Sequence, residues 1–86
     1  RPAATVPSLS VGNNKVAIGP EGLVQWYRVP DAATVTITGQ SHWKMFDSEF
    51  SLIGSGQDAQ ATEVVTAGTY LAVFGSPGSS ATVVLA

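Results

Sequence analysis

Turn-forming residues recur along this chain at intervals of about ten residues and separate short segments rich in valine, isoleucine, threonine and aromatic residues. Glycine and asparagine at these turns supply positive φ angles, and proline presets φ for a turn. The spacing predicts an all-β fold of about eight short antiparallel strands, arranged as a β-sandwich, a jelly roll or a small barrel. The expected strands are Ser8–Val11, Lys15–Ile18, Leu23–Val29, Ala33–Thr38, Glu49–Ile53, Ala61–Val65, Thr69–Gly75 and Ser80–Leu85.

The chain has 86 residues, which is the size of one domain. We expect residues 1–7, with prolines at positions 2 and 7, to form an extended N-terminal arm, and residues 8–86 to form a single β domain. A domain this small buries only about 60–65% of the surface that its unfolded chain exposes. Since the chain has no cysteine, disulfides cannot stabilise it, and self-association is the remaining route to a larger core.

Alternation of side chains indicates which residues of the middle strands face the core. Val35 and Ile37 alternate with three threonines, so these two residues are expected inside and the threonines outside. In the next predicted strand, Phe50 and Leu52 are expected to form the inward pair.

The last two predicted strands are apolar on both faces, a pattern typical of strands that are buried on both sides. We expect another subunit to cover one outer face of these strands. The candidate contacts for self-association are Leu71, Val73 and Val84.

The segment Gln40–Ser48 interrupts the alternation and holds the single histidine, the single methionine and one of the two tryptophans. A long loop or a single helical turn is expected here. Because loops carry function more often than strands do, Trp43, Met45 and Phe46 are the candidate contacts with a foreign partner.

The residues that catalysis would need are few and scattered, so we do not expect an enzyme. His42 is the one candidate general base, with Ser41 and Asp47 near it in the sequence, but no Gly-x-Ser-x-Gly motif is present. One histidine and no cysteine make no zinc site, and the six acids form no calcium-binding loop. No glycine-rich turn precedes a predicted helix that would hold a phosphate. We therefore predict no catalytic residue, metal or cofactor.

The charge of the chain argues against nucleic acid as a partner. Only 12% of the residues are charged, the formal net charge is −2, and the four basic residues do not cluster. No apolar run approaches the ~20 residues of a membrane span, so no membrane contact is expected either.

Three aromatic residues are candidates for stacking on sugar rings. Trp26 and Tyr27 are adjacent in a predicted strand and must point to opposite faces, so one of them is expected in the core. The other candidate is Trp43. Packing in the core or at a subunit interface is the favoured role of these rings.

The segment Val65–Gly75, followed by Ser76–Leu85, resembles the closing hairpin of small β-rich virion proteins of tailed bacteriophages. In those proteins an AGTY-like strand turns through glycine, serine and proline into a last apolar strand. Upstream, Ala33–Thr38 and Glu49–Ile53 lie about where such proteins carry their paired middle strands. The same hairpin also suits bacterial pre-peptidase C-terminal domains, which are secreted β-sandwiches.

The virion resemblance implies a capsid cement (decoration) protein on the capsid surface. Such a protein would assemble as a homotrimer and bind between subunits of the major capsid protein, and its N-terminal arm would reach a neighbour. An alternative function is a carbohydrate- or receptor-binding module of a phage tail or of a secreted protein, with an extracellular location. A third hypothesis is an accessory domain of a secreted enzyme, whose natural gene product would be much longer than this chain.

Overall fold

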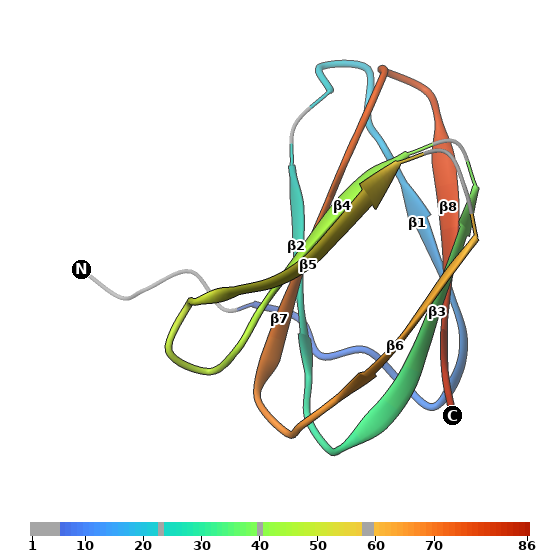
Figure 1. Cartoon of the computed structure of the whole chain (residues 1–86). Helices are drawn as coiled ribbons and strands as arrows, with labels where there is room; N and C mark the ends of the chain where they lie inside the picture. Colours follow the sequence, from blue (N-terminus) through green and yellow to red (C-terminus); the bar gives the residue numbers. More distant parts are fainter. Residues whose placement is uncertain (1–5, 23, 40, 58–59) are drawn as a thin grey trace.

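A computed structural model of the chain describes residues 6–22, 24–39, 41–57 and 60–86. Within these ranges every regular element is a β-strand, and all pairings between the strands are antiparallel. The predicted all-β class with eight short strands is confirmed (Figure 1). The strands are β1 (Gly12–Ala17), β2 (Gln25–Val29), β3 (Ala33–Gly39), β4 (His42–Phe46), β5 (Leu52–Gln57), β6 (Ala61–Val65), β7 (Thr69–Phe74) and β8 (Ser80–Leu85).

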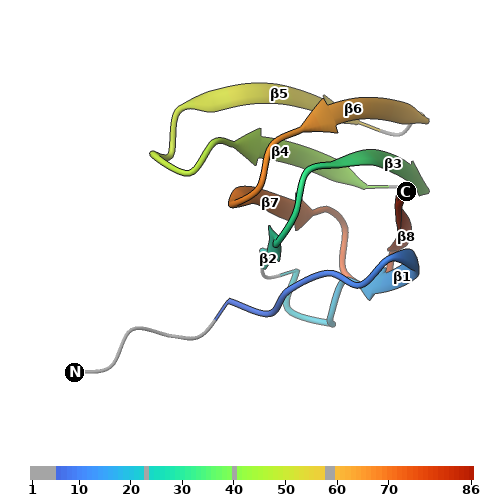
Figure 2. The same cartoon turned by 90° about the horizontal axis from the view of Figure 1, so that it is seen from below.

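The strands form two four-stranded sheets that face each other as the two layers of a sandwich (Figure 2). Sheet A has the strand order β2-β7-β4-β5, and sheet B has the order β1-β8-β3-β6. The β4–β5 connection stays within one sheet, whereas each of the other connections between successive strands crosses from one sheet to the other. Of the three architectures that the sequence left open, the chain adopts the sandwich.

The core lies between the two sheets and takes side chains from both. Val35 and Ile37 of β3 point into it, and the threonines that alternate with them lie on the outer side, as the sequence predicts. Tyr27 of β2 packs against this core, and its burial raises the pKa of the phenol above the ordinary value. The largest fully buried aliphatic side chains are Ile37, Met45, Leu71, Val16, Val29, Val35, Val73 and Val83.

The boundaries of four predicted strands, β3, β6, β7 and β8, agree with the structure to within one residue. The bounds of β6 and β8 are those predicted. β1 begins at Gly12 rather than Lys15, because the chain already pairs with β8 there. β2 begins at Gln25, and the expected first residue, Leu23, lies outside the described ranges.

The expected first strand, Ser8–Val11, is not a strand but attaches to the edge of sheet A. Leu9 is buried, and its N–H donates a hydrogen bond of 2.9 Å to the carbonyl of Arg28. The N–H of Arg28 in turn donates to the carbonyl of Pro7, also at 2.9 Å. Two hydrogen bonds make only one parallel bridge. Of the predicted N-terminal arm, residues 1–5 lie outside the described ranges.

The segment predicted as a loop or a helical turn is instead strand β4, between β7 and β5 in sheet A. The strand does alternate, with His42 and Lys44 outward and Trp43 and Met45 inward, but the outward Phe46 directly after Met45 ends the polar–apolar alternation after four residues and hid the strand. Trp43 and Met45 point into the core with 2% and 1% of their surfaces exposed. Phe46 lies on the outer face, and Gln40 lies outside the described residues.

The strand expected at Glu49–Ile53 lies further along the chain, because its first residues belong to the turn between β4 and β5. Phe50 and Leu52, the expected inward pair, are each 57% exposed. The Trp43 ring packs against Gly54 and Gly56 of β5, close enough that a Cβ built on Gly54 would lie 3.5 Å from it. The indole thus fills the space that larger side chains on β5 would occupy.

The last two strands do not form the closing hairpin expected from the sequence. β7 pairs with β2 and β4, whereas β8 pairs with β1 and β3, so the chain crosses the sandwich between them. Leu71 and Val73 point into the core and are fully buried, while Val84 is half-buried on the outer side of sheet B. The outer faces of β7 and β8 are therefore on opposite sides of the molecule and do not make the single self-association surface that was predicted.

Candidate binding surface

The outer face of sheet A presents aromatic side chains from three strands and one turn. Alternation places these side chains on the solvent side, because their neighbours along each strand point into the core. The strand register aligns the outward residues in three rows, which are Arg28-Tyr70-Phe46-Leu52, Trp26-Ala72-Lys44-Ser55 and Phe74-His42-Gln57. These rows, together with Val24 and Phe50 beside them, are called the aromatic face below.

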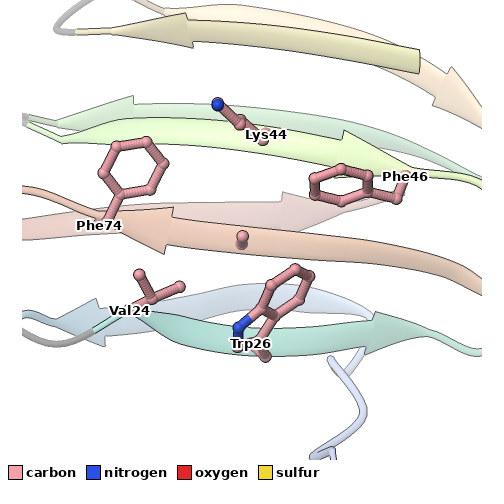
Figure 3. A pocket seen from close by; sticks show the side chains of 6 residues that line it. Val24, Trp26, Lys44, Phe46 and Phe74 are labelled. Atoms are coloured by element: carbon pink, nitrogen blue, oxygen red, sulfur yellow. The ribbon is translucent and has the colours of Figure 1, made fainter. Parts of the chain in front are cut away.

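A hollow of about 260 Å³ opens on the aromatic face (Figure 3). Its central residue is Ala72 on β7, which the register places between Trp26 of β2 and Lys44 of β4. A hollow forms here because a single methyl group lies among much larger side chains. The lining residues are Val24, Trp26, Lys44, Phe46, Ala72 and Phe74.

Contacts between rings hold the walls of this hollow. The ring centroids of Trp26 and Phe46 are 5.6 Å apart, with planes tilted by 35°. On the other side, the imidazole of His42 stacks on Phe74 with centroids 5.3 Å apart and planes within 12°. An aromatic pair contributes about 0.5–1.5 kcal/mol beyond the area that it buries. The walls are therefore packed in place without a ligand.

The turn between β4 and β5 places Phe50 over the same face. The Oδ1 atom of Asp47 accepts hydrogen bonds from the backbone N–H groups of Glu49 and Ser51, both at 2.9 Å. Phe50 has a φ of 64°, a left-handed conformation that costs of order 1–3 kcal/mol for a residue other than glycine. Its ring stacks on Tyr70 with centroids 4.6 Å apart. The strained backbone of Phe50 thus places one more exposed ring on this face.

The two outer faces of the sandwich differ in chemistry. On the aromatic face, Trp26 is 39% exposed and Phe50 is 57% exposed. Large apolar side chains gathered in one exposed patch mark binding surfaces more often than single ones do. The outer face of sheet B carries threonines instead, with the Oγ1 atoms of Thr36 and Thr62 at 3.3 Å on neighbouring strands.

The structure separates the six residues that the sequence singled out for partner contacts. Phe46 lines the hollow on the aromatic face, and Val84 lies on the outer side of sheet B. The other four are core residues, so their side chains are not available to a partner at the surface. These four are Trp43, Met45, Leu71 and Val73.

Sequence reasoning missed most of the residues that form the hollow. It did pair Trp26 with Tyr27 as residues on opposite faces, and the structure places Trp26 outside and Tyr27 against the core. Ala72 and Phe74 were not found, because β7 is apolar on both faces and its pattern does not tell which face is outward. Only the burial of Leu71 and Val73 in the structure shows that Ala72 and Phe74 face outward.

The residues considered for catalysis have separate surroundings. The imidazole of His42 lies on the aromatic face against Phe74, Ser41 is buried, and the carboxylate of Asp47 holds the backbone of its own turn. In the described parts of the chain, no group of three or more His, Cys, Asp or Glu side chains is placed to hold a metal ion. No helix that would be long and apolar enough to span a membrane occurs among the described residues.

Fold and surface together define a small two-sheet β-sandwich domain with one aromatic face. No model of a known protein family and no curated protein sequence matches the chain. In structure, the chain is similar to the pre-peptidase C-terminal domain of a collagenase from Bacillus anthracis, with a TM-score of 0.69 and 12% sequence identity. The alignment covers 100% of this chain and 99% of that domain. At this identity, the likeness shows a shared fold.

Proposed function

We propose that this domain is a non-catalytic binding module of an extracellular protein, and that it holds an extended polymer through the aromatic face. The observation that carries this proposal is the gathering of exposed rings around an open hollow, with Trp26 and Phe46 on one side and Phe74 on the other. Rings on an open face bury apolar area against a long ligand without enclosing its ends. Such a face suits attachment to a polymer.

The similar structure supports an accessory role and an extracellular location. It is a domain of a collagenase. A binding module that is linked to an enzyme raises the effective concentration of that enzyme at its polymer, without taking part in the reaction. Fibrillar collagen and insoluble polysaccharides are therefore the two groups of polymers to test.

The test uses the two tryptophans, which have different surroundings. Trp26 is on the aromatic face, whereas Trp43 is 2% exposed, so acrylamide quenches the fluorescence of Trp26 preferentially. We expect the protein to sediment with at least one of fibrillar collagen, chitin, cellulose and a calcium polygalacturonate gel. Soluble fragments of that polymer should protect Trp26 from acrylamide.

The variant Trp26→Ala should lose retention on the polymer. Val64→Ala is the matched control, because Val64 is an apolar side chain on β6 of sheet B and is 84% exposed. This control should be retained like the wild type. Equal retention of both variants, or no retention of the wild type on any of the four polymers, would show that the proposal is wrong.

The capsid-decoration role, the homotrimer and contact with the major capsid protein stay predictions of the sequence. A β-sandwich is compatible with them, but the two strands on which the resemblance was based lie in different sheets. The mass of the purified chain in solution tests the homotrimer. A monomer at all concentrations would exclude it.

A further inference from the structure

The distribution of charge over the two sheets is uneven. The four strands of sheet A contain no aspartate or glutamate, and they carry Arg28 and Lys44 on the aromatic face. The acids among the described residues lie in turns or on β6 of sheet B. A chain with a net charge of −2 therefore presents a binding face on which both fixed charges of the strands are positive. The strands of this face attract anions, while Asp47 and Glu49 lie at its edge in the turn that carries Phe50.

Lys44 belongs to the hollow itself. The register places it directly across β7 from Trp26, with Ala72 between them. A ligand ring that fills the space above Ala72 lies against the indole of Trp26. The ammonium group of Lys44 points away from Ala72 in the structure (Figure 3), so pairing with this ligand requires a rotation of the Lys44 side chain. The hollow thus combines an apolar ring with a single cation.

We infer that the polymer held by the aromatic face is an acidic polysaccharide, whose sugar rings stack over the hollow and whose carboxylates pair with Lys44 and Arg28. This inference rests on the proposed function and names its ligand. The C–H face of a pyranose matches the indole of Trp26, and a uronic acid carries its carboxylate at the edge of the ring. One uronate residue can therefore stack on Trp26 with its ring and pair with Lys44 through its carboxylate.

The position of Arg28 indicates a chain rather than a single sugar. Arg28 and Lys44 are separated by two strand spacings and one row, which corresponds to about 12 Å between their Cα atoms. At this separation each cation has room to pair with a carboxylate of its own. Successive acidic residues of a polysaccharide would contact the two cations in turn.

Peptide ligands fit this face less well. The backbone N–H and C=O groups of β7 and β4 are used in pairing with their neighbours on both sides, so the aromatic face offers no main-chain partners to a peptide. Amides of a bound peptide that lost water without gaining a partner would cost about 1–3 kcal/mol each. Sugar rings have C–H faces that need no such partner.

A second copy of the chain also fits poorly. In a two-fold dimer through this face, each copy would bury its Arg28 and Lys44 in the shared interface, and the four strands of sheet A supply no acid to pair with them. Unpaired like charges buried in one interface oppose association. An anionic partner supplies the missing opposite charge, and a second copy adds more cations.

The experiment compares polygalacturonate with its fully methyl-esterified form, which has the same backbone without the charge. Binding of the whole chain is measured by calorimetry and by protection of Trp26 from acrylamide. We expect binding of polygalacturonate that weakens as sodium chloride is raised, and weaker binding of the ester. Lys44→Gln and Arg28→Gln should each lower the affinity by about three- to fivefold, the effect of one partly exposed ion pair.

Lys15→Gln is the matched control, because Lys15 is an exposed cation on β1 of sheet B. Its affinity should equal that of the wild type. Equal affinity for the acid and the ester, or equal losses in Lys15→Gln and Lys44→Gln, would overturn the inference and leave the binding function standing if Trp26→Ala still abolishes binding. Equally tight binding of poly-glutamate would assign the face to acidic peptides instead. Absence of binding to every polymer tested would overturn both the inference and the proposed function.

Discussion

Gly56 shows how closely single residues are fitted between the two sheets. A Cβ at this position would lie 2.7 Å from Nε1 and 2.9 Å from Cε2 of Trp43, whose indole is buried. Gly56→Ala is therefore expected to lower the free energy of unfolding by about 1–3 kcal/mol, the usual cost of overpacking a core. Urea unfolding followed by circular dichroism measures it. The control is Gly19→Ala, where no atom lies within 4 Å of the added Cβ, and an equal loss there would contradict the explanation.

The phenol of Tyr27 links a core position to the pH dependence of stability. Burial raises its pKa above the ordinary value of 10.0 because desolvation disfavours the phenolate. As the pH rises above 10.0, the phenol ionises more readily in the unfolded chain than in the folded one. The contribution of Tyr27 to the free energy of unfolding should therefore be constant below that pH and should fall above it. Tyr27→Phe should remove this part of the alkaline loss. Urea unfolding of both proteins from neutral to strongly alkaline pH makes the comparison, and parallel losses would contradict the prediction.

At the scale of single elements, the sequence predicts strands well where one face is polar. In β3 the threonines alternate with Val35 and Ile37, and both the strand and its inward face are correct. In β7 both faces carry large apolar or aromatic residues, so alternation gives no direction, and in β4 the alternation lasts only from His42 to Met45 before the outward Phe46 breaks it. There the sequence led to a loop in place of β4 and to the wrong outward face for β7. Only the neighbouring strands decide which side of such a strand is buried.

Strand β4 provides a direct test of this assignment. If Met45 contacts a partner from a loop, its removal should leave folding unchanged. Because Met45 is instead 1% exposed in the core, Met45→Ala is expected to lower the free energy of unfolding by about 2–5 kcal/mol. Lys44→Ala changes the adjacent residue on the opposite face and should stay within about 0.5 kcal/mol of the wild type. Similar losses of unfolding free energy in the two variants would contradict the placing of residues 42–46 in a strand with Met45 inward. Thermal or urea unfolding measures both.

At the scale of the whole molecule, the aromatic face depends on strand order. Trp26 and Ala72 are far apart in the chain, yet they become neighbours because β2 pairs with β7. The strands and their apolar residues can be predicted from the sequence. Their order in the sheets cannot, because many orders of eight short strands bury similar apolar areas. For this reason the fold class was predictable and the hollow was not.

The same strand order predicts how the chain folds. β1 pairs with β8, β2 with β7 and β3 with β6, so these pairs join strands that are far apart in the sequence. Of the described strands, only β4 and β5 follow each other directly in the chain and also pair. Closing such long loops costs entropy before any contact is gained, and all-β domains of this kind refold in about milliseconds to seconds. Stopped-flow refolding followed by tryptophan fluorescence should show this range. The rate should not depend on protein concentration, because the two sheets of one chain cover each other. Refolding in microseconds would contradict the strand order, and a rate that rises with concentration would favour the homotrimer predicted from the sequence.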